Sequence, residues 1–194
     1  MLAMEEKILR EGKVMPGNIL KVGRFLNQQL DIAFLNEVGK EMARLYRDAG
    51  VTKVITIEAS GIPMATFAAY HLGVPAVIVK KHASANQSRH VYTAEIASFT
   101  HGNTYTGAVA KEYIKPDDRF LIVDDFLACG NAIIGMRKII AEAGASLVGC
   151  AIAIEKKFQG GGDALRAEGV RVESLAMIDH MSDDSLTFYR PEQD

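Results

Sequence analysis

The chain has few of the residues on which small stapled or zinc-bound folds depend. It contains two cysteines, Cys129 and Cys150, and neither lies in a Cys-x-x-Cys pair. This spacing argues against both a structural zinc site and a disulfide framework. It favours a reducing compartment, so we expect a cytoplasmic protein.

An excess of charge and membrane-directed segments are also missing. The 22 Lys and Arg residues nearly balance the 24 Asp and Glu residues, for a net charge of −2, whereas nucleic-acid binders usually show a strong basic excess. Residues 1–14 are charged and lack the apolar core and cleavage site of a signal peptide. His71, Gly73 and Pro75 interrupt the apolar run of residues 61–79, which predicts a buried helix and strand instead of a membrane span.

What the chain does have is an ordinary globular composition. Hydrophobic residues make up 48% of its 194 positions and charged residues 24%. A chain of this length buries roughly 70% of its unfolded surface, which is enough for a core without staples. We therefore expect one domain over residues 1–194, with little disorder and no internal repeat.

Apolar segments of helical and extended type alternate along most of the chain. Helices are expected at Leu2–Glu11, from the cap Asp31 to the stop at Gly50, at Ile62–Leu72 and at Asn131–Ala143. Strands are expected at Lys53–Ile57, Ala76–Val79, Phe120–Val123, Leu147–Ile154 and Val170–Ile178. This alternation of apolar strands and helices predicts an α/β fold whose central, mainly parallel sheet is covered on both faces.

Two segments lie outside this alternation. Residues 19–30 are expected to be irregular or partly extended. Residues 82–106 are rich in polar side chains and have no helical period. A long polar excursion inside a compact domain is usually functional or disordered, so we predict a mobile loop or a two-stranded flap.

The most informative motif is Phe120-Leu-Ile-Val-Asp-Asp-Phe-Leu-Ala-Cys-Gly-Asn-Ala132. Four apolar residues lead into Asp124 and Asp125, and a turn of small residues then precedes a helix. The N–H groups at a helix N-terminus bind phosphate, and Gly130 allows the backbone to come close to it. Two carboxylates just before the turn suit sugar hydroxyls or a hydrated magnesium ion. The motif therefore predicts a pocket for a phosphorylated sugar at the carboxyl end of a parallel strand.

This motif resembles the phosphoribosyl pyrophosphate (PRPP) binding motif of the type I phosphoribosyltransferases. Members of that family usually carry Thr near the start of the turn and Gly-Thr after the Gly. Cys129, Asn131 and Ala132 stand at those places here, so two side-chain donors to the 5′-phosphate are absent. The resemblance implies that Ala128–Ala132 bind PRPP and that Asp124 and Asp125 are the catalytic carboxylates.

A second turn and a basic cluster fit the pyrophosphate half of PRPP. Glu58-Ala-Ser-Gly61 follows a buried strand and precedes a helix, and the resemblance makes Ser60 and Gly61 part of the pyrophosphate loop. A simple tight turn is the alternative. Lys81 and His82, which follow Lys80 after the next strand, could bind the leaving group, or could simply be a solvated strand end.

Two further segments are similar to the bacterial xanthine phosphoribosyltransferase family. They are residues 19–31 and Ile154-Glu-Lys-Lys-Phe158, and the similarity extends along nearly the whole chain. It implies that Leu20, Asn27 and Lys156 bind xanthine, whose two exocyclic oxygens need donors such as an ammonium and an amide. By themselves these residues could equally be a core leucine, a turn asparagine and a solvated lysine.

The resemblance also implies an activity, a cofactor and partners. The expected reaction converts xanthine and PRPP to xanthosine 5′-monophosphate and pyrophosphate, with Mg²⁺ held mainly by the substrate. A hood over the base would come from about residues 1–30 and the C-terminal segment, and residues 82–106 would be the flap. A homodimer is expected, and neither nucleic acid nor membrane is. An enzyme for another base (guanine, hypoxanthine, adenine or orotate) and a non-catalytic PRPP-sensing regulator remain as alternatives.

Overall fold

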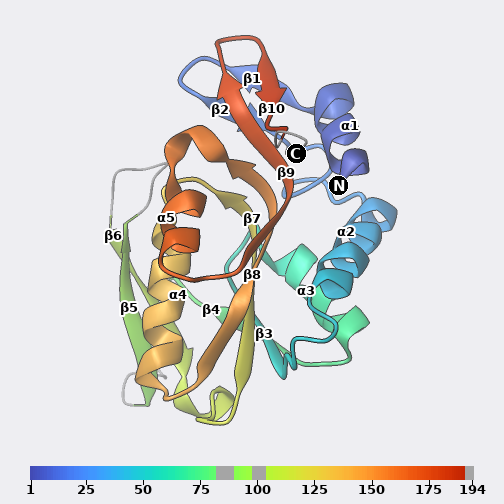
Figure 1. Ribbon diagram of the computed structural model, residues 1–194. Coiled ribbons are helices and arrows are strands. Elements are labelled where there is room, and N and C mark those ends of the chain that lie inside the picture. Colours follow the sequence, from blue (N-terminus) through green and yellow to red (C-terminus); the bar gives the residue numbers. More distant parts are fainter. Residues whose placement is uncertain (82–89, 98–103, 191–194) are drawn as a thin grey trace.

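A computed structural model of the protein describes residues 1–81, 90–97 and 104–190. Its centre is a six-stranded sheet with the strand order β10-β9-β8-β7-β3-β4 (Figure 1). The strands are β3 Lys53–Ile57, β4 Ala76–Val79, β7 Arg119–Leu127, β8 Ser146–Lys156, β9 Val172–Met181 and β10 Leu186–Phe188. Every neighbouring pair is parallel except β9 and β10. The predicted α/β fold with a mainly parallel sheet is confirmed.

Helices cover both faces of this sheet (Figure 1). On one face, α2 (Ile32–Leu45) and α3 (Ile62–Leu72) pack against each other. On the other lie α4 (Asn131–Glu142) and α5 (Gly161–Ala167), together with an antiparallel pair formed by β5 (Val91–Ala97) and β6 (Thr104–Ala110). Strand β5 and the first residues of β6 fall in residues 82–106, for which a loop or a two-stranded flap was predicted. Residues 82–89 and 98–103 of that segment lie outside the described residues. Two short 3-10 helices, η2 (Lys111–Tyr113) and η3 (Lys157–Gln159), follow β6 and β8.

The buried side chains of β7 explain why its sequence is continuously apolar. Leu121 and Val123 belong to the hydrophobic cluster that includes α2 and α3. Phe120 and Ile122 belong to the cluster that includes α4. Because successive side chains of a strand point to opposite faces, a strand covered on both sides needs apolar residues at every position.

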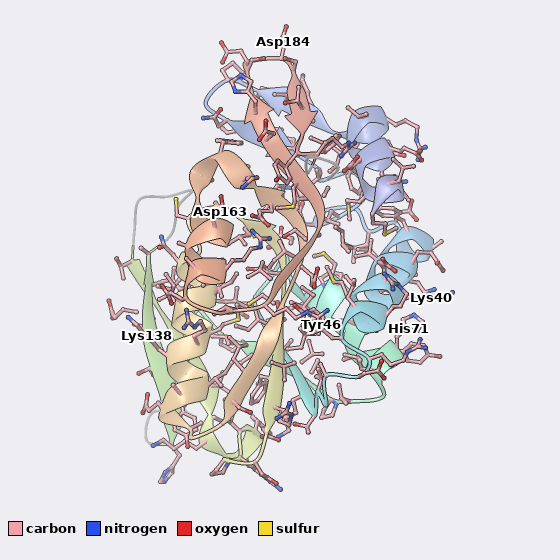
Figure 2. The ribbon with its side chains drawn as sticks, in the orientation of Figure 1. Lys40, Tyr46, His71, Lys138, Asp163 and Asp184 are labelled. Carbon is pink, nitrogen blue, oxygen red and sulfur yellow. The ribbon has the colours of Figure 1, made fainter. Side chains whose placement is uncertain are left out.

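Several predicted boundaries match those of the structure. The helices at Leu2–Glu11 and Ile62–Leu72 and the strands at Lys53–Ile57 and Ala76–Val79 occur as predicted. Asp31 is the N-cap of α2, and its Oδ1 accepts a hydrogen bond of 3.1 Å from the backbone N–H of Phe34. Figure 2 shows Lys40 on the outer side of α2, where its side chain is 63% exposed. The predicted start of this helix at the cap Asp31 is confirmed, whereas the helix ends at Leu45, before the predicted stop at Gly50.

The N-terminal and C-terminal segments lie together at one end of the sheet (Figure 1). Helix α1 (Leu2–Glu11) packs near β9, and a hairpin of β1 (Lys13–Met15) and β2 (Ile19–Lys21) follows it. The guanidinium of Arg190 forms a fork with both carboxylate oxygens of Glu5. Within the part of the chain that the structure describes, no helix is long and apolar enough to span a membrane.

Candidate functional site

The carboxyl ends of four parallel strands meet at one edge of the sheet. The turn with Ser60 and Gly61 follows β3, and Lys81 follows β4. Asp124 and Asp125 lie near the end of β7, and Lys156 is the last residue of β8. In open α/β sheets, ligands bind outside this edge. His82, the remaining candidate of the pyrophosphate cluster, lies outside the described residues.

Asp124 and Asp125 are buried. Both lie within β7, because this strand stays paired with β8 as far as Leu127 and Glu155. The backbone N–H of Asp125 donates to Asp124 Oδ1 at 2.9 Å, and the N–H of Phe126 donates to Asp125 Oδ1 at 3.0 Å. The strand prediction, which ended at Val123, was too short. The backbone bonds hold both carboxylates in fixed orientations.

The two carboxyl groups differ in their electrostatic surroundings. Burial and, second, the neighbouring charge of Asp125 raise the pKa of Asp124 well above its ordinary value. Lys81 acts in the opposite direction on the same group, which places a positive charge near Asp124. A carboxyl group with a raised pKa and a charged neighbour is a typical feature of a functional site.

The segment that follows β7 has the geometry of an anion cradle. Gly130 adopts a left-handed conformation with φ 85° and ψ 5° and precedes the first residue of α4. This conformation favours glycine, and the first N–H groups of the helix that follows have no partner within the helix. The side-chain amide of Asn131 donates to the carbonyl of Ala97 at the end of β5 (3.2 Å), so it joins the loop to the β5–β6 pair.

The turn after β3 is packed closely against Asp124. A Cβ atom on Gly61 would lie 2.1 Å from Thr56 Oγ1 and 3.1 Å from Asp124 Oδ1, so only glycine fits. Thr56 Oγ1 is buried and has no hydrogen-bond partner among the residues that the structure describes. Sequence reasoning missed Thr56, because a threonine inside an apolar strand is indistinguishable from an ordinary strand former.

The cationic end of β4 is held by Glu58, the first residue of the same turn. Glu58 accepts a hydrogen bond of 2.6 Å from the backbone N–H of Lys81 and forms an ion pair of 3.1 Å with Lys80. Partial burial opposes ionisation of Glu58, but these contacts outweigh it, and its pKa is lowered. The ammonium of Lys81 lies 5.3 Å from the ring centroid of Tyr105 on β6.

One of the three candidate base-binding residues contacts the aspartate pair, and a second lies near Phe126, the next residue of β7. Asn27 Nδ2 donates to Asp125 Oδ2 at 3.3 Å. Lys156 Nζ donates to the backbone carbonyl of Asn18 at 2.7 Å and lies 5.6 Å from the ring centroid of Phe126. Burial lowers the pKa of Lys156. These contacts join the N-terminal segment to the ends of β7 and β8.

Leu20, the third of these candidates, is 7% exposed in β2 and belongs to the same hydrophobic cluster as α2 and α3. The two neighbouring lysines at the end of β8 have different partners. The strand ends at Lys156, and Lys157 begins η3 and forms an ion pair of 2.7 Å with Asp163.

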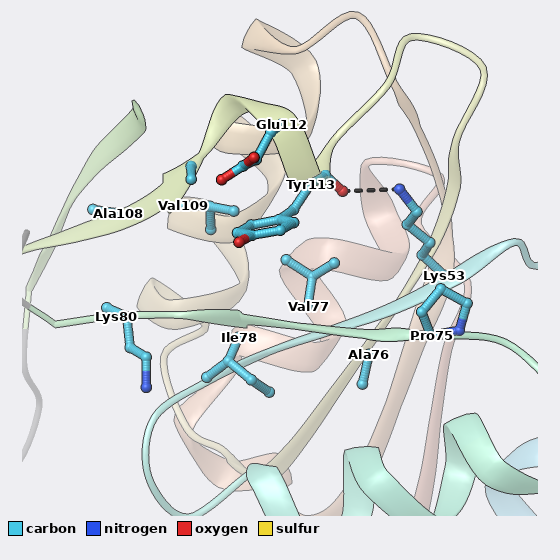
Figure 3. A pocket seen from close by; sticks show the side chains of 11 residues that line it. Lys53, Pro75, Ala76, Val77, Ile78, Lys80, Ala108, Val109, Glu112 and Tyr113 are labelled. Carbon is cyan, nitrogen blue, oxygen red and sulfur yellow. Dashed lines mark hydrogen bonds between the residues drawn. The ribbon is translucent and has the colours of Figure 1, made fainter. Parts of the chain in front are cut away.

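One hollow of the molecule lies away from the two aspartates. It has a volume of about 440 Å³ and runs between β4 and the β6–η2 segment, with Ile78, Val109 and Tyr113 among its walls (Figure 3). Its lining residues include Lys80 but neither aspartate and none of the base candidates. This hollow is therefore separate from the candidate site at the strand ends.

The donor set near the aspartates is compatible with magnesium that a substrate carries. In residues 1–81, 90–97 and 104–190, no group of three or more His, Cys, Asp or Glu side chains could hold a metal ion. Magnesium usually keeps several waters and binds one or two carboxylates together with substrate phosphates. Asp124 and Asp125 can supply those carboxylates, so the residues present fit the ion.

Comparisons with known proteins agree with this geometry. Residues 27–181 match the model of the phosphoribosyl transferase domain. The xanthine phosphoribosyltransferase of Bacillus cytotoxicus is 46% identical over 99% of this chain and 98% of its own. The protein of the same name from Alkaliphilus metalliredigens is 47% identical over 95% of this chain and 92% of its own.

Solved structures with the same fold are more distant in sequence. An adenine phosphoribosyltransferase of Rhodothermus marinus superposes with a TM-score of 0.73 and 23% identity, over 91% of this chain and 99% of its own. The enzyme of Giardia lamblia in complex with 9-deazaadenine gives a TM-score of 0.75 and 21% identity, over 91% and 98% of the two chains. At this identity the likeness shows the fold alone. By its domain match and its full-length relatives, the chain belongs to the xanthine phosphoribosyltransferase family of the type I phosphoribosyltransferases.

Proposed function

We propose that the protein transfers the phosphoribosyl group of PRPP to N9 of xanthine, giving xanthosine 5′-monophosphate and pyrophosphate. The observation that carries this proposal is the buried pair Asp124 and Asp125, which lies directly before the Gly130 turn and the N-terminus of α4. Relatives named xanthine phosphoribosyltransferase, at 46% and 47% identity over nearly the whole chain, support the choice of base.

The 5′-phosphate of PRPP binds the loop Ala128–Ala132 in this proposal. The missing hydroxyls of this loop leave the backbone N–H groups and the positive end of the α4 dipole as the donors. Gly130 supports this role, since its left-handed conformation directly precedes the N-terminus of α4. Asp124 and Asp125 hold the ribose hydroxyls, and their negative charge stabilises the cationic sugar of the transition state.

The proton released from xanthine has an acceptor in this arrangement. The raised pKa of Asp124 means that it takes up a proton more readily than an exposed carboxyl group. When magnesium is bound, it neutralises the negative charge that develops on pyrophosphate. That leaving group binds to Ser60, Gly61, Lys81 and His82. The role of Lys81 is supported by its proximity to Asp124. Catalysis then rests on positioning and charge, without a covalent intermediate.

Xanthine lies between the strand ends and the N-terminal segment. Lys156 and Asn27 donate to its exocyclic oxygens, and Leu20 forms part of the apolar floor. In the structure the Lys156 ammonium is bound to the Asn18 carbonyl, which supports a hood made from residues 1–30 that contacts the base through this lysine. A site with these donors disfavours bases that lack the matching oxygens.

A homodimer is also part of the proposal, as the family resemblance implies. A cytoplasmic location is supported by the free thiols of Cys129 and Cys150. Sedimentation of the purified protein tests the dimer directly. A monomer at all concentrations would remove this part and leave the reaction unchanged.

The decisive experiment is a pyrophosphate-release assay with PRPP and magnesium. Xanthine, guanine, hypoxanthine, adenine and orotate are compared for the wild type and for Lys156→Ala, with Lys157→Ala as the matched control. We expect xanthine to be preferred, and its kcat/KM to fall on the order of a hundredfold in Lys156→Ala but little in Lys157→Ala. Preference for another base would discard the roles of Asn27 and Lys156. PRPP binding without release from any base would favour a PRPP-sensing regulator.

A further inference from the structure

Helix α5 contacts the phosphate loop directly. It begins at Gly161, whose backbone N–H donates to the carbonyl of Ala128 at 3.1 Å. A Cβ atom on Gly161 would lie 2.2 Å from that carbonyl oxygen, 2.6 Å from the carbonyl carbon of Cys129 and 2.8 Å from the nitrogen of Gly130. The start of α5 is therefore in backbone contact with three residues of the loop.

The same helix is anchored at its other end by a buried carboxylate. Glu155 has no exposed surface, and Arg166 donates to both of its oxygens, at 2.8 and 2.7 Å. Ser174 of β9 donates to Glu155 as well, and Arg166 also donates to the carbonyl of Val172 at 3.2 Å. A bidentate pair of this kind fixes direction as well as distance. A buried carboxylate without these partners would be strongly disfavoured.

Gly162 connects the anchor to the loop contact. A Cβ atom there would lie 2.0 Å from Glu155 Oε1 and 2.8 Å from the nearer guanidinium nitrogen of Arg166. Two successive glycines therefore allow α5 to approach the loop on one side and the carboxylate on the other. These glycines are the first two residues of α5, and the close approaches at both positions leave no room for a side chain, so packing accounts for their presence.

The anchor lies next to the base-binding candidate in the sequence. Glu155 points to α5 and β9, whereas the following residue, Lys156, contacts the N-terminal segment and Phe126. Glu155 is also paired in register with Leu127, the residue before the loop. One strand end thus carries the base contact and the support of the phosphate loop at adjacent positions.

We propose that α5, anchored by Glu155 and Arg166, is a clamp that sets the position of the Ala128–Ala132 loop for the 5′-phosphate of PRPP. Gly161 and Arg166 are then positioning residues that act on phosphate binding without touching the substrate. The inference rests on the proposed function in assigning the 5′-phosphate to this loop. It adds that PRPP affinity depends on α5, which contributes no contact of its own to PRPP.

The test compares Gly161→Ala with Ala164→Gly, an exposed position of the same helix. The dissociation constant of PRPP with magnesium is measured by calorimetry, and KM for PRPP and for the base by initial rates. We expect Gly161→Ala to weaken PRPP binding on the order of tenfold, because the added methyl displaces the loop backbone, and to leave KM for xanthine unchanged. Ala164→Gly lowers the melting temperature without changing either constant.

Arg166 gives an independent second test in the same assays. Arg166→Met should weaken PRPP binding, and Arg166→Lys should restore part of it, because lysine keeps the charge but not the fork. A merely structural role would lower the melting temperature and the active fraction, and would leave KM for PRPP unchanged below the transition. Unchanged PRPP affinity in folded Gly161→Ala and Arg166→Met would overturn the clamp and leave the proposed reaction intact. Weakened PRPP binding in a protein that does not use xanthine would overturn the proposed base and support the clamp.

Discussion

At the scale of single residues, Asp124 is a group whose burial serves function at the expense of stability. Burial and the charge of Asp125 raise its pKa in the folded protein. The carboxyl group of Asp124 therefore binds its proton more strongly in the folded state than in the unfolded state. The contribution of protonated Asp124 to the free energy of unfolding is complete below the ordinary carboxyl pKa. It is lost as the pH rises through the raised pKa of the folded protein.

We therefore predict opposite effects of Asp124→Asn on activity and on stability. Turnover should fall on the order of a hundredfold, because the carboxylate that stabilises the cationic sugar is gone. The melting temperature at pH 8 should rise by about 2–4 °C, the shift that ~1 kcal/mol produces at this size. Asparagine keeps the Oδ1 that accepts the hydrogen bond from Asp125, so the local backbone is retained.

The check is urea unfolding of both proteins at pH 5 and pH 8, together with steady-state rates. The gain in the free energy of unfolding should be larger at pH 8 than at pH 5. Asp117→Asn, at an exposed position just before β7, is the matched control and should change neither quantity. An equal gain in the free energy of unfolding for Asp124→Asn at both pH values would show that ionisation of Asp124 does not destabilise the folded protein.

At the scale of elements, the approach of α2 to α3 depends on one small residue. A Cβ atom on Gly39 would lie 2.3 Å from the Cβ of Phe67 and 2.6 Å from its carbonyl carbon. We predict that Gly39→Ala destabilises the protein by about 1–3 kcal/mol, because the helices must separate. This cost outweighs the gain of up to ~1 kcal/mol that alanine brings to a helix.

Thermal unfolding measures this effect, with Lys40→Ala on the outer side of α2 as the control. Lys40→Ala also increases helix propensity, but it removes only an exposed side chain with an ion-pair distance of 4.0 Å. It should leave the melting temperature within about a degree of the wild type. A rise in melting temperature for Gly39→Ala would mean that the two helices are not in close contact at this position.

Elements whose apolar pattern decides their structure could be predicted from the sequence, and those decided by pairing could not. Strand β7 was expected to end at Val123, since aspartate is a poor strand former. It continues to Leu127 because its pairing with β8 extends to Glu155, and pairing outweighs that propensity. Short strands such as β10 have no apolar period of their own and form only against a partner, here β9.

The same distinction applies to the candidate site. The aspartate pair and its loop could be found because they are contiguous and carry a recognisable spacing. The clamp of α5 could not, because Glu155 and Arg166 are 11 residues apart and their contact depends on how a turn folds back. Thr56 was missed for a similar reason, since its position beside Gly61 follows only from the tertiary packing.

At the scale of the whole molecule, the two ends of the chain are joined at the end of the sheet that carries the candidate site. The N-terminal ammonium donates to the carbonyl of Leu175 in β9, and Glu5 of α1 pairs with Arg190 beyond β10. The hairpin of β1 and β2, which follows α1, contacts Lys156 through the carbonyl of Asn18, which accepts a hydrogen bond from the lysine ammonium. Contacts between residues far apart in the sequence thus hold the N-terminal segment, α1 and its hairpin, against β8, β9 and the C-terminal segment.

We predict that Arg190→Ala raises KM for xanthine by roughly fivefold and leaves the dissociation constant of PRPP unchanged. Loss of the fork loosens α1 from the C-terminal segment, and with it the hairpin that contacts Lys156, whereas the phosphate loop is supported from α5. Arg44→Ala, which removes the exposed ion pair with Glu41 on α2, is the matched control and should change neither constant. Steady-state kinetics measure KM for xanthine, and calorimetry measures the dissociation constant of PRPP. An effect of Arg190→Ala on PRPP alone would mean that the joined termini support the phosphate side, and the hood would then have to be assigned elsewhere.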